Sequence, residues 1–183
     1  MRLFFAIKFP QIFLEEITQY QEKIQSDYWR LTPIDNLHLT LLFLGEVNDN
    51  ALFNIKQIAT QIQNRLKGKT IYLKLQRIEY GPNLLRPRLI WITGENNKEL
   101  NLLNQLLRQN LKPFIEKEEH FDFTPHITIA RFNTFIKPDK LPSLPQPDLF
   151  NNKIITIKSF YLMESKLSFQ KGAQYFDLQE YCF

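Results

Sequence analysis

Residues 36–45 read Asn-Leu-His-Leu-Thr-Leu-Leu-Phe-Leu-Gly, an apolar run with a histidine and a threonine set into it. The content is typical of a buried β-strand. Because residues two apart on a strand point to the same face, His38 and Thr40 are predicted to project together. Leu39 and Leu41 then face the opposite layer. The run therefore predicts a rigid strand that presents one imidazole and one hydroxyl.

A second run repeats this pattern. Residues 124–131 read Thr-Pro-His-Ile-Thr-Ile-Ala-Arg, so that His126 and Thr128 are also predicted to share a face. The chain has only three histidines, and two of them lie in a His-x-Thr pattern. Taken singly, each histidine could be a hydrogen-bonded core residue. The matched pair favours one site shared by both strands.

The rest of the chain alternates between strand and helix patterns. Strands are predicted at 3–9, 36–44, 70–80, 88–93, 123–132, 153–163 and 175–178, and amphipathic helices at 11–26, 52–66 and 97–111. Residues 29–33 and the proline-rich residues 137–148 are predicted to be connections. Because several strands follow one another without a helix between them, antiparallel pairing and an α+β fold are expected. No clear linker divides the chain, so residues 1–183 are expected to form a single domain.

Composition limits the classes of protein to consider. The 183 residues are 44% hydrophobic and 23% charged, as in an ordinary globular protein. The formal net charge of +4 suits an anionic partner such as a nucleic acid. The single cysteine, Cys182, excludes an intramolecular disulfide and a cysteine-based zinc site, and it favours the cytoplasm. The apolar run at the N-terminus is too short for a signal peptide, and none approaches a membrane span.

Two imidazoles and two hydroxyls suit phosphodiester chemistry. One neutral and one protonated imidazole provide a base and an acid near neutral pH, and threonine hydroxyls can hydrogen-bond phosphate oxygens. A metal site is the competing use of paired histidines. His120, Asp122 and His126 could converge on a metal, but His120 lies in a charged run and is expected at the surface. No metal is therefore expected.

The two runs resemble the paired signatures of the two-histidine phosphoesterase superfamily. Within it, the chain is most similar to the RNA 2′,3′-cyclic phosphodiesterases, also called LigT-like or 2′-5′ RNA ligases. Residues 1–7, 86–91 and 162–167 resemble other segments of that family. The resemblance implies a bilobal α+β fold with two pseudo-symmetric antiparallel-sheet lobes and helices outside. Each lobe would contribute one His-x-Thr motif to a central cleft.

The same resemblance implies an activity and a set of roles. The activity is hydrolysis of an RNA 2′,3′-cyclic phosphate end to a 2′-phosphomonoester. His38 would protonate the departing 3′ oxygen and His126 would activate water, while Thr40, Thr128 and Arg131 would bind the phosphate. The expected partner is an RNA or oligonucleotide with a cyclic phosphate end. A cytoplasmic monomer without cofactor, metal or membrane association is expected.

At two positions, this sequence does not fully match the pattern on which these roles depend. The family often has a basic residue where this chain has Leu42, and Arg131 lies five residues after His126. On an ideal strand Arg131 would point away from the imidazole, so a phosphate contact requires a bulge or the end of the strand. Three alternatives stay open: an RNA-end binding protein without turnover, 2′-5′ ligation, and a small cyclic nucleotide as substrate.

Overall fold

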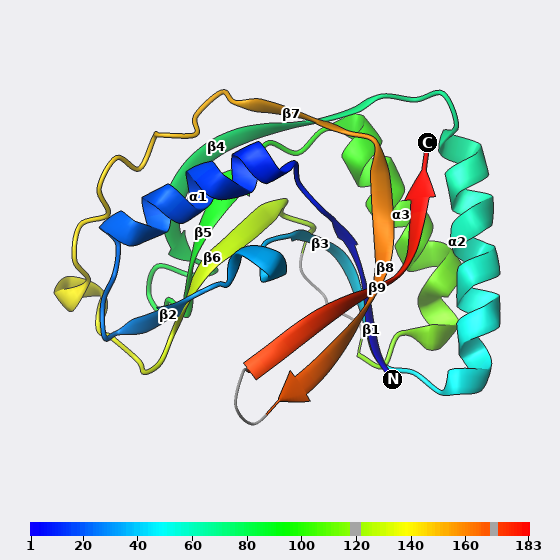
Figure 1. Ribbon diagram of the computed structural model, residues 1–183, viewed down its shortest axis with the longest axis horizontal. Helices are drawn as coiled ribbons and strands as arrows, with labels where there is room; N and C mark the ends of the chain where they lie inside the picture. The colour runs from blue at the N-terminus through cyan, green and yellow to red at the C-terminus, as the bar shows by residue number, and fades with distance from the viewer. Residues whose placement is uncertain (118–121, 169–171) are drawn as a thin grey trace.

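The computed structural model describes residues 1–117, 122–168 and 172–183. Its described residues form nine strands and three α-helices, which confirms the α+β prediction (Figure 1). The strands are β1 (Arg2–Ile7), β2 (Trp29–Leu31), β3 (Leu39–Glu46), β4 (Ile71–Gly81), β5 (Leu89–Gly94), β6 (His126–Phe132), β7 (Ile154–Ile157), β8 (Ser159–Ser168) and β9 (Gly172–Cys182). The helices are α1 (Gln11–Lys23), α2 (Leu52–Leu66) and α3 (Lys98–Leu111).

The sheet divides into two four-stranded halves. Its order is β7-β4-β5-β6-β3-β1-β8-β9, with β2 paired to β6 beside this path. The halves β7-β4-β5-β6 and β3-β1-β8-β9 meet where β6 pairs with β3, and the register there is the single pair Leu39 and Ile127. Each of the two joining strands carries one of the His-x-Thr runs. The weakest pairing in the sheet therefore lies where the two motifs come together.

The helices cover these halves from outside. In Figure 1, α1 lies across the half that contains β4, β5 and β6, whereas α2 lies beside β9, and α3 contacts both β3 and β4. Helix α1 buries Phe13, Ile17 and Tyr20 at the helical spacing seen in the sequence. Burial of each such side chain contributes roughly 1.5–3 kcal/mol. Asn97 caps the N-terminus of helix α3, where its side chain accepts a hydrogen bond from the backbone N–H of Leu100 at 2.9 Å.

Three predicted boundaries were wrong. Trp29–Leu31 is a strand rather than a connection, because it pairs with the end of β6. The predicted strand 153–163 is two strands divided at Lys158: β7 pairs with β4 in one half, and β8 pairs with β1 in the other. The last strand extends far beyond residues 175–178, to Gly172–Cys182, because it pairs with β8 along its length.

Both motif strands shift register just after their threonine. Thr40 pairs with Ala6, but the next pair of β1 and β3 is Phe5 with Leu42, so Leu41 is an extra residue. On β6, Thr128 pairs with Trp91, and the next pair joins Ala130 to β5. These shifts are β-bulges, and each reverses the alternation of side chains beyond it. The residues that follow the bulges therefore return to the face of the histidines.

None of the helices in the described part of the chain is long and apolar enough to cross a membrane.

Candidate active site

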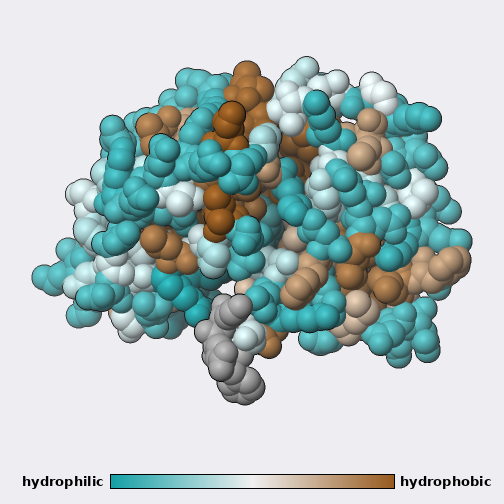
Figure 2. Space-filling view, in the orientation of Figure 1, coloured by the Kyte–Doolittle hydropathy of each residue, from teal (hydrophilic) through white to brown (hydrophobic). Residues whose placement is uncertain are grey.

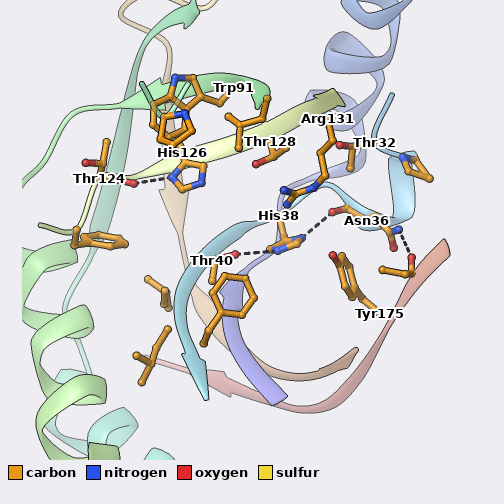
Figure 3. Close-up of a pocket in the computed structure, with 18 of the residues that line it drawn as sticks. Thr32, Asn36, His38, Thr40, Trp91, Thr124, His126, Thr128, Arg131 and Tyr175 are labelled. Carbon is orange, nitrogen blue, oxygen red and sulfur yellow. Dashed lines mark hydrogen bonds between the residues drawn. The ribbon is translucent and has the colours of Figure 1, made fainter. Parts of the chain in front are cut away.

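A cavity of about 660 Å³ lies between the two halves of the sheet. Both histidines, both threonines and Arg131 line it, so the fold brings together all five residues predicted from the sequence (Figure 3). Figure 2 shows that the face viewed in Figure 1 is largely hydrophilic, with apolar side chains exposed in a band between the two sides of the molecule. The cavity is large enough for a nucleotide-sized ligand.

His38 is held on two sides by its own strand. It lies one residue before β3, and its Nδ1–H donates to the carbonyl oxygen of Asn36 at 2.7 Å. Its Nε2 lies 3.1 Å from the hydroxyl of Thr40. Because the carbonyl can only accept, the proton of a neutral imidazole is on Nδ1, and the Thr40 hydroxyl then donates to Nε2. The structure thus fixes both the orientation and the tautomer of this ring.

The surroundings of His38 favour its neutral form. Its ring centroid lies 5.2 Å from that of Phe4 and 5.1 Å from that of Tyr175. Removal from water is the largest effect, and it lowers the pKa of His38 from 6.5 to about 4. The hydrogen bond to Asn36 opposes this effect, while electrostatic interactions with Arg131 and His126 add to it. In the ligand-free site His38 is therefore neutral at pH 7.

His126 is the first residue of β6 and repeats the backbone arrangement of His38. Its Nδ1–H donates to the carbonyl oxygen of Thr124, two residues earlier, at 2.8 Å. Its ring lies 4.7 Å from the ring of Trp91, whose Nε1–H donates to Glu79. Trp91 fits here because Gly81 has no side chain: a β-carbon at this position would overlap the indole ring. In both motifs, then, Nε2 is the ring nitrogen offered to the cavity.

Arg131 lies on the same face as His126 because of the bulge. The burial pattern along β6 alternates up to Thr128, then shows two buried residues, Ile129 and Ala130, before the exposed Arg131. Figure 3 shows the guanidinium directed toward His38, which agrees with its effect on the pKa of that ring. The bulge that a phosphate contact by Arg131 requires is therefore present in β6.

The balance of charge in the cavity favours an anion. Its described lining includes the guanidinium groups of Arg30, Arg108 and Arg131 but only one carboxylate, that of Asp122. Leu42 also lines the cavity and is 6% exposed, so the first motif supplies no charge at that position. Positive side chains from β2, α3 and β6 would therefore attract an anionic ligand between the two motifs.

The alternative metal site would include His120, Asp122 and His126. His120 falls within residues 118–121, outside the described residues. Among the residues described, no group of three or more His, Cys, Asp or Glu side chains could hold a metal ion.

Some lining residues were not selected as site residues from the sequence. Asn36 fixes His38 and also donates from Nδ2 to the carbonyl oxygen of Ala173 at 2.8 Å, which ties the motif to β9. Tyr175 and Arg30 reach the cavity from β9 and β2. These strands are distant in sequence from both motifs, and only the tertiary fold brings them to the site. Asn36 was within the quoted motif, but its position alone gave no sign of this role.

Comparison with known proteins gives one family. A model of the 2′-5′ RNA ligase superfamily matches residues 10–164. The chain is 33% identical to an RNA 2′,3′-cyclic phosphodiesterase of Methanocaldococcus jannaschii, over 77% of each protein. It is 30% identical to one from Thermotoga maritima, over 92% of this chain and 88% of the other.

Solved structures agree with this relationship over nearly the full length. A crystal structure from Thermus thermophilus superposes with a TM-score of 0.82 at 27% identity, covering 100% of this chain and 97% of the other. The Escherichia coli LigT complex with 3′-AMP superposes with a TM-score of 0.80 at 28% identity, covering 99% and 97%.

Proposed function

Since the chain belongs to the 2′-5′ RNA ligase superfamily, we propose that it hydrolyses RNA 2′,3′-cyclic phosphate ends to 2′-phosphomonoesters, with His38 and His126 as a metal-free acid–base pair. One observation carries this proposal. Two imidazoles face one cavity from two different strands, and each has its Nδ1 fixed by the carbonyl two residues earlier. Both rings therefore offer Nε2 to a ligand between them, as a paired acid and base require.

The reaction breaks the bond between phosphorus and the 3′ oxygen and forms a new bond from phosphorus to the oxygen of water. His126 Nε2 takes a proton from the attacking water, and His38 Nε2–H gives a proton to the departing 3′ oxygen. Arg131 and the hydroxyls of Thr40 and Thr128 stabilise the charge on the non-bridging oxygens. The product carries a 2′-phosphomonoester and a free 3′-hydroxyl.

The acid role requires His38 to gain a proton, because it is neutral in the ligand-free site. A bound phosphate monoanion supplies negative charge beside the ring and offsets the positive charge of Arg131. Both changes raise the pKa of His38, so substrate binding and proton uptake are coupled. Protonation also reverses the hydrogen bond with Thr40: Nε2–H becomes the donor, and the Thr40 hydrogen is released to bind the phosphate.

The experiment is product analysis with a short RNA that ends in a 2′,3′-cyclic phosphate, in the presence of EDTA. The wild-type protein is expected to give a 2′-phosphate end, and folded His38→Ala and His126→Ala proteins are expected to give none. Unchanged activity in either variant would overturn the acid–base pair. Tight binding by wild type without product would instead support a role in holding RNA ends.

A further inference from the structure

Arg30 forms an unusual pair with Arg131. The two are direct partners in the antiparallel ladder of β2 and β6, so their side chains leave the same face of the sheet. Both are exposed, and both line the cavity between the motifs. Like charges placed directly opposite each other destabilise a strand pair. Some other property of this position must therefore favour arginine.

Packing does not require the charge of Arg30. The neighbouring residues of β2 make the apolar contacts: Trp29 is 5% exposed, and its ring lies 5.4 Å from that of Phe132. Within residues 1–117, 122–168 and 172–183, no carboxylate lies within ion-pair distance of either Arg30 or Arg131. Two arginines on one face of the sheet, without a carboxylate within ion-pair distance, are suited to an anionic ligand.

The two arginines differ in what they can reach. Arg131 is directed toward His38 and so toward the reacting phosphate (Figure 3). Arg131 lies three residues beyond Thr128 on β6, so the two residues are at most about 10 Å apart along the strand. Arg30 lies opposite Arg131 on the neighbouring strand β2. Arg30 therefore stands at the end of the cavity beyond the reacting group. Pro33, Pro82 and Leu89 line the cavity as well and provide an apolar surface for a sugar or base.

We propose that Arg30 binds the internucleotide phosphate on the 5′ side of the reacting ribose, so that the site selects oligonucleotide ends over cyclic mononucleotides. The proposal rests on the proposed function, since it assumes that a cyclic phosphate occupies the space between His38 and His126. A cyclic mononucleotide has no phosphate for Arg30 to bind. A dinucleotide is the shortest substrate that has one.

The test compares adenosine 2′,3′-cyclic phosphate with an adenylyl dinucleotide ending in the same group. In Arg30→Gln, the preference for the dinucleotide, measured as the ratio of the two kcat/KM values, is expected to fall about tenfold, as for loss of one hydrogen bond to a charged group. In a plot of log KM for the dinucleotide against log salt concentration, the slope should be smaller by about 0.7 than in wild type. Arg30→Lys should keep the salt slope. The matched control is Arg65→Gln, an exposed arginine of α2 outside the cavity, which should leave the ratio unchanged.

Binding measurements separate this proposal from the proposed function. Calorimetry with 2′-phosphorylated mono- and dinucleotides needs no turnover, and Arg30→Gln should weaken only the dinucleotide, by about tenfold. Selective weakening in a protein that cleaves nothing would support the subsite and overturn the hydrolysis. Equal loss of both ligands, or no loss of either, would overturn the subsite.

Discussion

The two His-x-Thr motifs share a backbone and differ in their surroundings. In each, the imidazole Nδ1 binds the carbonyl two residues earlier, and a bulge follows the threonine. Five residues after the histidine, however, the first motif places Phe43 and the second places Arg131. The repeated backbone sets the geometry of the pair, and the unlike neighbours give the two rings different electrostatic surroundings.

The surroundings matter for acid–base chemistry, because one imidazole must be protonated while the other is neutral. His38 lies among Phe4 and Tyr175 and has its pKa lowered to about 4, while His126 lies against Trp91. A negatively charged ligand raises the pKa of a nearby imidazole most strongly where the ring is most shielded from water. The asymmetry thus makes the protonation of His38 dependent on the substrate.

The largest effect should come from removing either histidine. His38→Ala and His126→Ala are each expected to lower kcat by about 10³-fold or more, within the range for general acid–base catalysis. Since the two rings act as a unit, the double variant should be no slower than the worse single variant. Single-turnover assays would measure this. Additive losses would show that the two motifs act independently, and circular dichroism would check the fold.

Removal of either threonine should lower activity less than removal of a histidine, and the loss should differ between the two motifs. Thr40→Val and Thr128→Val are each expected to lower kcat/KM about 10- to 100-fold, because each removes a hydrogen bond to a charged phosphate. Thr40→Val should be the more damaging, since the Thr40 hydroxyl also contacts His38 Nε2. Thr60→Val, on α2 and outside the cavity, is the control. If Thr40→Val and Thr128→Val lowered kcat/KM equally, the contact of Thr40 with His38 would have no separate role in activity.

Arg131→Gln should reduce the electrostatic difference between the motifs. Loss of the guanidinium is expected to raise the pKa of His38, because its positive charge is one cause of the low value. It should also weaken binding of inorganic phosphate about tenfold. NMR titration of the imidazole would report the pKa with and without phosphate. A His38 pKa that does not rise when phosphate binds to wild type would contradict substrate-coupled protonation.

The last predicted effect is on stability rather than on activity. The folded-state pKa of His38 lies below its ordinary value, so its contribution is present above pH 6.5 and is lost as the pH falls toward 4. The free energy of unfolding of wild type should therefore fall more steeply over this range than that of His38→Phe. The extra fall is no more than about 3.5 kcal/mol, at about 1.4 kcal/mol for each pKa unit. Urea denaturation at several pH values would measure it, and parallel curves would contradict the low pKa.

Period-2 and period-3.6 patterns were enough to predict the motif strands and the three helices. The pairing of His38 with Thr40 follows from alternation alone, because both strands are supported by buried apolar residues. The bulges also had a sequence signal: Leu41 and Leu42 break the alternation of β3 in the same way that Ile129 and Ala130 break that of β6.

Other features depended on contacts distant in sequence. Trp29–Leu31 is too short to show a period, so neither β2 nor the place of Arg30 in the cavity could be predicted. The division between β7 and β8 had a signal that was missed: Ile155 and Ile157 are buried at odd positions, but Phe160 is buried at an even one, so the parity changes near Lys158. Tyr175 reaches the site only through the pairing of β8 with β9.

Helix α3 contacts both halves of the sheet, and α1 covers a half to which its own segment of chain does not belong. Strands β4 to β7 form one half from a continuous stretch of chain, yet α1, from the N-terminal segment, covers it, while α3, from within that stretch, contacts β3 of the other half as well as β4 (Figure 1). No continuous segment therefore contains one half together with its own helical layer. We infer that a chain cut into two fragments would not yield two half-sites, because each fragment would leave the other with an uncovered apolar sheet. The catalytic geometry is then lost in a single cooperative transition with the whole fold.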